Sequence, residues 1–279
     1  MKKIIILLFA AMSSLCMSAQ VTSEFSINGG GGLSTLNYKL SSGKKSFGFG
    51  GDFGLGYTCI FKEQWGIHIG MGLGLYNAKA DLDGVQIITS NFRDSENDVF
   101  NLHSTLNHYT EVQNAMFLNI PVMIQFQTKG KQKFYAKAGV KAGIPINCKY
   151  SVSSATITNE AYYPDYDNWL TMPEFAGFGT FTNQNFDGDF KLAVTAILAV
   201  EMGAKWRLGE KLALYTGFYF DYGLNNSLKD NSPFVDYINS YPARFTTNSA
   251  LPSLTDKINL MAAGIKLRFA LVNSKNITE

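Results

Sequence analysis

Eight charged side chains occupy positions that would bring them together inside a narrow structure. Each lies in a segment whose neighbouring positions are apolar or small, and both signs of charge occur. Buried charges of opposite sign pair with one another, because an isolated charge away from water is costly. The eight residues are Asp52, Lys137, Lys141, Glu201, Lys205, Asp221, Lys266 and Arg268. We predict that they form an interior network of ion pairs, and the alternative is that they line an ion-conducting slot.

A second set of candidate residues is aromatic and lies in two long segments, 147–189 and 226–256. Exposed aromatic side chains often mark contact surfaces, because they bury a large area on binding. The same side chains can instead pack on each other as a lid, so both interpretations stay open. The candidates are Tyr162, Tyr163, Tyr166, Trp169, Tyr237 and Tyr241.

Catalytic and metal-binding patterns are weak. A hydrolase needs a histidine positioned beside a carboxylate or a serine, and no spacing here indicates one. The residues considered are His68, His103 and His108, with Asp94, Ser95, Asp98 and Ser104 near the last two histidines. Asp81 and Asp83 begin a calcium-like turn that lacks the remaining ligands. We therefore expect no enzyme, no cofactor and no metal site.

The elements that would position these residues have an apolar period of two, which is the period of extended strands. In one of them Phe53 and Leu55 alternate with Asp52 and Gly54. The pattern occurs eight times, at 24–36, 47–61, 65–76, 115–127, 133–146, 190–207, 212–224 and 257–271. Three of the connections are short turns, and those between them are long.

The composition of the two strand faces decides between a soluble sheet and a membrane barrel. Charged residues make up 16% of the chain, against about 25% in soluble domains. The non-apolar face is rich in glycine and has few charges, whereas a soluble sheet turns a charged face to water. Small residues and paired charges fit a narrow barrel interior, with the apolar face towards lipid.

Aromatic residues on the apolar face lie beside the short turns or at the last strand end, as in the girdle of a membrane barrel. They are Phe61, Trp65, Phe126, Phe134, Trp206 and Phe269. We predict an all-β fold over 21–271, an eight-stranded antiparallel up-and-down transmembrane β-barrel with long extracellular loops. Closure follows because backbone groups in lipid must all be paired.

The two ends of the chain are expected to lie outside this barrel. Residues 1–20 combine Lys2 and Lys3, a short apolar run and small residues, which is typical of a cleaved secretory signal peptide. Residues 272–279 form a polar C-terminal tail. The balance of 24 Lys+Arg against 22 Asp+Glu gives no basic footprint for nucleic acid.

Three segments give a family resemblance that covers the mature chain. Residues 117–124 (FLNIPVMI) with 134–139 (FYAKAG), and 219–225 (YFDYGLN), resemble strands of the Bacteroidetes outer-membrane β-barrel family called PorT-like. The chain is also similar to the N-terminal barrel of OmpA-like proteins. Asn119 stands where family members often carry an acidic residue. No peptidoglycan-binding domain follows, so we do not expect cell-wall tethering.

The resemblance and the strand pattern together imply a location in the outer membrane of a Gram-negative bacterium, with lipid around the barrel. We expect a structural or surface-interaction role, a lumen filled by side chains, and binding of an extracellular or envelope protein through the long loops. The alternative is a small-solute or ion channel, and a membrane-embedded hydrolase is less favoured.

Overall fold

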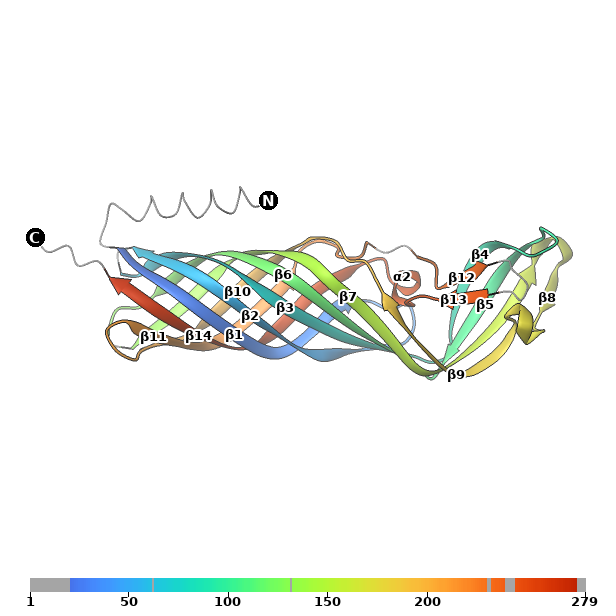
Figure 1. Cartoon of the computed structure of the whole chain (residues 1–279), viewed down its shortest axis with the longest axis horizontal. Coiled ribbons are helices and arrows are strands. Elements are labelled where there is room, and N and C mark those ends of the chain that lie inside the picture. The colour runs from blue at the N-terminus through green and yellow to red at the C-terminus, as the bar shows by residue number, and fades with distance from the viewer. Residues whose placement is uncertain (1–20, 62, 131, 230–231, 239–243, 275–279) are drawn as a thin grey trace, which may run out of the picture.

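The computed structural model describes residues 21–61, 63–130, 132–229, 232–238 and 244–274. The expected signal peptide at 1–20 lies outside the described residues. Eight long antiparallel strands wind around a common axis (Figure 1). They are β1 (Val21–Tyr38), β2 (Lys44–Phe61), β3 (Trp65–Leu82), β6 (Tyr109–Gln127), β7 (Lys133–Tyr163), β10 (Thr195–Arg207), β11 (Leu212–Gly223) and β14 (Ile258–Ser274).

Strand pairing closes these elements into a ring. The order runs β10-β11-β14-β1-β2-β3-β6-β7, and β7 pairs again with β10, with Lys137 opposite Glu201. The first and last strands pair along almost their whole length, from Thr22 opposite Ser274 to Tyr38 opposite Ile258. The prediction of an all-β antiparallel barrel is therefore confirmed. The last strand continues to Ser274, so it includes the first three residues of the expected tail at 272–279.

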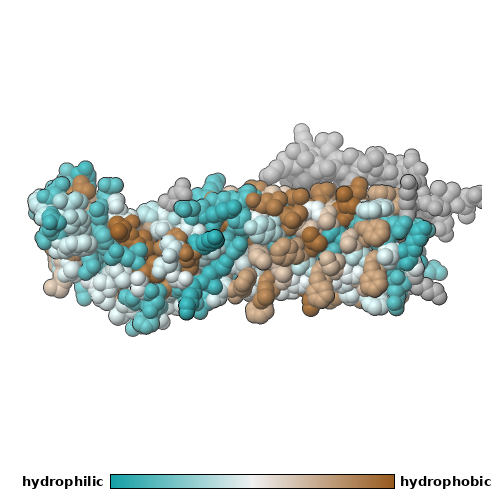
Figure 2. All heavy atoms as spheres, turned by 180° about the vertical axis from the view of Figure 1, so that it is seen from behind, coloured by the Kyte–Doolittle hydropathy of each residue, from teal (hydrophilic) through white to brown (hydrophobic). Residues whose placement is uncertain are grey.

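The two faces of the wall have opposite chemistry, as predicted. Outward side chains are apolar and exposed: Phe53 is 58% and Val122 51% exposed, while Ile69 on the same face is 8% exposed. Inward positions on the same strands hold buried polar groups such as His68 and Gln125. Apolar side chains gather over the barrel half of the surface (Figure 2). This polarity is the reverse of a soluble β-sandwich, and it places lipid outside.

Bands of aromatic side chains border the apolar surface at both ends. Trp65 and Phe126, near the short-turn end, lie with ring centroids 5.0 Å apart, and the Trp206 indole donates a hydrogen bond to Thr216 Oγ1 at 3.0 Å. Phe49 and Phe220 are exposed towards the other end. Such rings favour the depth of the lipid headgroups, so the bands mark the limits of the membrane-spanning part.

The interior differs between the two halves of the molecule. Towards the long-loop end it is a packed apolar core, shared by strands on opposite sides of the ring. Leu36, Phe117, Ile197 and Leu260 are all fully buried there. Leu192, expected to face lipid within a strand beginning at residue 190, is instead buried, because β10 begins only at Thr195. A polar interior is left only towards the short-turn end.

The segments expected to be long loops are mostly folded as strands. β3, β6 and β7 continue beyond the ring, and further strands join β7, which we call the β-extension (Figure 1). Its strands are β4 (Val85–Arg93), β5 (Val99–Asn107), β8 (Asn168–Leu170) and β9 (Gly179–Asp189). β12 (Val235–Ile238) pairs with β13 (Arg244–Thr247) as a separate hairpin, and α2 is Leu251–Leu254. No helix within the described residues has the length and hydropathy to cross a bilayer.

Candidate functional site

The polar half of the lumen is built by inward positions of all eight ring strands. Glycines on the same face make the room for its side chains. A Cβ atom at Gly30 would collide with Asp52 Oδ1, and one at Gly56 would collide with the His68 ring. The small residues of the sequence pattern therefore have a steric role, which is to let polar side chains fold across a narrow interior.

The structure places all eight predicted charged residues in this lumen, and six of them form ion pairs with one another. Lys141 Nζ lies 2.6 Å from Asp221 Oδ2, and Lys266 Nζ lies 2.6 Å from Asp52 Oδ2. Arg268 Nη2 lies 3.8 Å from Glu201 Oε1. Seven of the eight residues are buried, and Asp52 is partly buried.

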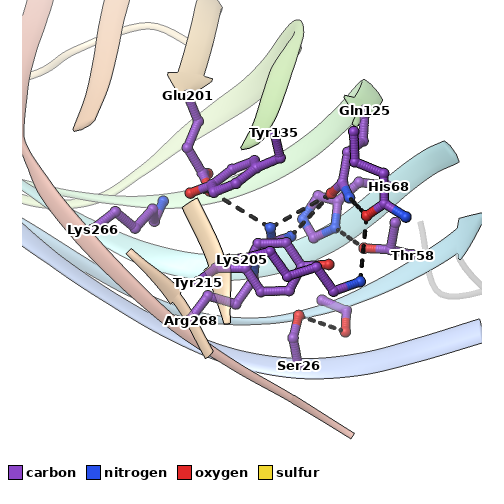
Figure 3. Close-up of polar contacts among 12 residues, drawn as sticks. Ser26, Thr58, His68, Gln125, Tyr135, Glu201, Lys205, Tyr215, Lys266 and Arg268 are labelled. Carbon is purple, nitrogen blue, oxygen red and sulfur yellow. Dashed lines mark hydrogen bonds and ion pairs between the residues drawn. The ribbon is translucent and has the colours of Figure 1, made fainter. Parts of the chain in front are cut away.

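Arg268 is the centre of this arrangement (Figure 3). It is 1% exposed, and its guanidinium carbon lies 3.7 Å from the centroid of the Tyr215 ring and 5.3 Å from that of Tyr135. Tyr135 in turn donates a hydrogen bond of 2.8 Å to Glu201 Oε1. The planar cation is thus held between aromatic faces and a carboxylate, an arrangement that suits arginine better than lysine.

One carboxylate of the network, Glu24, was not predicted from the sequence. It is fully buried, pairs with Lys205 and accepts a hydrogen bond from the Tyr215 hydroxyl. Lys205 also donates to Gln127 Oε1 at 3.3 Å. The position of Glu24 could have indicated an inward side chain, because it alternates with the outward Phe25 at the start of the first strand.

A second buried carboxylate, Glu111, lies beyond the ring towards the β-extension. Its oxygens accept hydrogen bonds from the Tyr109 hydroxyl and the Ala250 backbone N–H, both at 2.9 Å, and from the Ser249 hydroxyl. Leu251, next along the chain in α2, is buried in the core. These bonds hold Ser249 and Ala250, which belong to the long segment 226–256, at the outer end of the barrel. This part of the segment lies over the barrel as a lid.

Most aromatic residues of the β-extension form its interior. Phe100 is fully buried and contacts Tyr163, Phe178 and Tyr237, with ring centroids 5.4, 5.8 and 5.3 Å away. Burial and the Asp94 carboxylate both raise the pKa of the Tyr163 hydroxyl, which donates a hydrogen bond of 3.1 Å to Asp94. Tyr163 and Tyr237, two of the six aromatic candidates, therefore serve packing.

Other aromatic candidates lie at the outer tip. Trp169 is 48% and Tyr166 62% exposed, and the Tyr162 and Trp169 rings lie 5.0 Å apart. The Tyr166 hydroxyl donates to Asp98 Oδ2 at 3.0 Å, which ties the turn after β7 to the turn between β4 and β5. Tyr241 lies outside the described residues. Some aromatic candidates therefore pack inside the β-extension, and others are exposed at its tip.

The histidines and nearby serines do not assemble a catalytic group. His68 Nδ1 shares a hydrogen bond of 2.8 Å with Thr58 Oγ1 in the lumen, while His103 packs on Trp169 in the β-extension at 4.7 Å between centroids. Burial lowers the pKa of His103. Ser104 follows His103 on the same strand and points to the opposite face, where it donates to Asn159 Oδ1 at 2.8 Å.

The candidate calcium turn is used for internal bonding. Asp81 accepts a hydrogen bond of 2.7 Å from Thr110 and lies 3.0 Å from Lys79. Asp83 accepts the His108 backbone N–H at 3.0 Å. Among the described residues, no group of three or more His, Cys, Asp and Glu side chains could hold a metal ion.

A closed antiparallel ring with lipid-compatible side chains outside and ion pairs inside defines the class of transmembrane β-barrels. The sequence matches the family described as outer membrane protein beta-barrel domain over residues 18–229. The chain belongs to this family and is a protein of the Gram-negative outer membrane, as predicted.

Solved structures of small outer-membrane proteins are similar to this chain at low identity, and no curated protein matches it significantly. Ail of Yersinia pestis, solved with the heparin analogue sucrose octasulfate, is 11% identical with a TM-score of 0.32, covering 91% of this chain and 99% of Ail. OprG of Pseudomonas aeruginosa is 13% identical with a TM-score of 0.32, covering 90% and 96%. Neisserial surface protein A is 8% identical with a TM-score of 0.32, covering 88% and 95%.

Proposed function

We propose that the protein is a non-conducting and non-catalytic eight-stranded barrel that holds the β-extension outside the cell and binds a protein partner at its tip. The observation that supports this most directly is the apolar surface left exposed at the tip, far from lipid, while the aromatic residues beneath it are packed. Large exposed apolar groups clustered on a folded element are typical of interaction sites.

The tip surface consists of side chains from the turns and short strand after β7. It comprises Tyr166, Trp169, Leu170, Met172 and Phe175. Met172 is 70% and Phe175 63% exposed. Hydrogen bonds within the element fix its shape: Tyr162 donates to Asp167 Oδ1 at 2.9 Å, so little ordering is required on binding.

Charge around the tip surface favours a cationic partner. The residues at 93–98 and 160–177 include the carboxylates Asp94, Glu96, Asp98, Glu160, Asp165, Asp167 and Glu174. The only cation in these two stretches is Arg93. Complementary charge raises the association rate with a partner and disfavours partners of like charge. Exposed aromatic faces also attract ammonium and guanidinium groups. We infer that the partner presents a lysine- or arginine-rich segment.

A peptide-binding measurement tests the tip surface. The protein in lipid nanodiscs should bind a fluorescent oligolysine peptide, and added salt should weaken the binding. Trp169→Ala should weaken it by about tenfold or more, because a central aromatic contact is worth roughly 2 kcal/mol. Leu208→Ala, at an exposed position of the turn between β10 and β11, is the matched control and should bind like wild type. Equal affinity for Trp169→Ala and wild type would exclude the tip as the contact surface.

The lumen supports the non-conducting part of the proposal. In the polar half, ion pairs link strands that are not neighbours in the ring, Lys141 on β7 with Asp221 on β11 and Arg268 on β14 with Glu201 on β10. The apolar core fills the other half. In planar lipid bilayers we expect no steady single-channel conductance at membrane potentials of ordinary size. A reproducible conductance step that disappears when Arg268 is changed to methionine would instead support the channel alternative.

The narrower family placement belongs to the same proposal. We propose membership of the PorT-like branch, because two of the three resembling segments, 117–124 and 134–139, form the paired hairpin β6–β7 that continues into the β-extension. The register sets Phe117 opposite Pro145 and Ile124 opposite Ala138. The proposed role needs no peptidoglycan binding.

A further inference from the structure

A small cavity lies within the polar half of the lumen, and four of the sixteen residues that line it are cations. Its volume is about 40 Å³, and Lys137, Lys141, Lys266 and Arg268 line it together with His68. The acidic and amide groups that also line it are Asp52, Glu201, Asn28 and Asn119. A water molecule needs about 10–15 Å³ of such free volume, so the cavity has room for a few molecules or ions of that size.

The charges around the cavity do not balance. The lumen holds five cations, Lys137, Lys141, Lys205, Lys266 and Arg268, against four carboxylates, Glu24, Asp52, Glu201 and Asp221. Four ion pairs use all four carboxylates. Lys137, which is 2% exposed, is left without an ion pair or hydrogen bond to the described part of the chain. Its register partner Glu201 is already engaged by Arg268 and Tyr135.

No other carboxylate is close enough to compensate. Among the described residues, Glu111 is the one further acidic side chain that is buried, and it lies near the start of β6, whereas Lys137 pairs with Gln125 near its end. At the rise per residue of a strand, Glu111 and the position of Gln125 are roughly 45 Å apart along β6. A charge at that distance contributes little, because Coulomb energy falls with separation.

We propose that this cavity binds a small monovalent inorganic anion of the chloride class, held by Lys137 and Arg268. A buried ammonium group needs a counter-charge, and water can hydrogen-bond to it but cannot neutralise it. Arg268 Nε is a second buried donor at the same cavity that has no partner. Both donors are more than nine-tenths buried, so an anion held between them would be shielded from bulk water.

Water completes the site beside the anion. Two buried acceptors facing the cavity, Asp52 Oδ1 and Asn119 Oδ1, also have no hydrogen-bond partner. An anion cannot donate to these oxygens, whereas a water molecule can donate to one of them and to the anion. The cavity therefore suits one anion with one or two waters, which matches its volume.

Halide dependence of the barrel's thermal stability tests the proposal. The purified full chain in detergent is heated in sodium chloride or in sodium gluconate of equal ionic strength, and loss of the fast-migrating folded form is followed on gels. Chloride should raise the transition by roughly 2–4 °C, because a ligand that binds only the folded state stabilises it. Lys137→Met should remove the difference between the two salts, while the exposed control Lys211→Met should keep it.

Crystals of the wild-type chain soaked in sodium bromide give an answer that does not depend on any variant. An anomalous bromide peak beside Lys137 Nζ is the expected result. Water alone at that position, or equal transitions in chloride and gluconate, would overturn the proposal. A halide effect that survives in Lys137→Met would also overturn it, since the anion would then lie elsewhere. None of these outcomes bears on partner binding at the tip.

Discussion

Replacing Glu201 with alanine is expected to destabilise the barrel by about 3–5 kcal/mol, the range found when one partner of a buried ion pair is removed. Glu201 is buried, accepts the Tyr135 hydroxyl at 2.8 Å and lies 3.8 Å from Arg268. Its removal leaves Arg268 as a buried cation without its carboxylate partner. The free energy of unfolding, measured by urea titration of the protein in lipid vesicles, should fall accordingly.

Two further variants separate the loss of charge from loss of packing. Glu210→Ala removes a carboxylate from the exposed turn between β10 and β11 and should change stability by less than about 0.5 kcal/mol. The double variant Glu201→Met with Arg268→Met removes both charges and should recover much of the loss, because well-packed apolar pairs replace buried ion pairs at little cost. Equal effects of Glu201→Ala and Glu210→Ala would show that the network contributes nothing to stability.

The alternation of residue types was sufficient to predict which way side chains face. In the strand that begins at Lys133, Val140 points outward and Lys141 inward, and this follows from the two-residue period alone. The lumen residues were found for the same reason. A local pattern specifies a face, and in a closed ring the inward face converges on one axis.

The partners within the lumen could not be predicted from the sequence. Lys205 pairs with Glu24, 181 positions away, and Lys141 pairs with Asp221, 80 positions away. Which charges meet depends on the tilt and stagger of the strands around the ring, and these are properties of the closed barrel. The excess of one cation in the lumen emerges only when these pairs, including the one made by Glu24, are known.

The β-extension was expected as loops, although part of its signal is present in the sequence. Phe100, Leu102 and Leu106 alternate with polar residues and are all fully buried on β5. The expectation failed because long connections in membrane barrels are treated as loops by default, and these strands lie outside the apolar band. Their buried face packs against other parts of the β-extension, and this partner is invisible to a local pattern.

Arginine in place of Val122 tests the lipid-facing side of the wall. Val122 is 51% exposed in the central part of β6, where it lies opposite Ile69 and Val140. A cation at the bilayer midplane costs about 2–4 kcal/mol in a β-barrel, because its charge must leave water. We expect Val122→Arg to lower the free energy of unfolding in lipid vesicles by that amount and to reduce the yield of folded protein.

The same change in the β-extension provides the matched control. Ile88 on β4 is also aliphatic and 54% exposed, but it lies beyond the apolar band, in water. Ile88→Arg should therefore leave stability within about 0.5 kcal/mol of wild type, as surface substitutions usually do. Two side chains of similar size and exposure would then differ only in the solvent they face. If vesicle-inserted protein tolerates both substitutions equally, the exposed face of β6 does not contact lipid, and the inside and outside of the ring have been assigned wrongly.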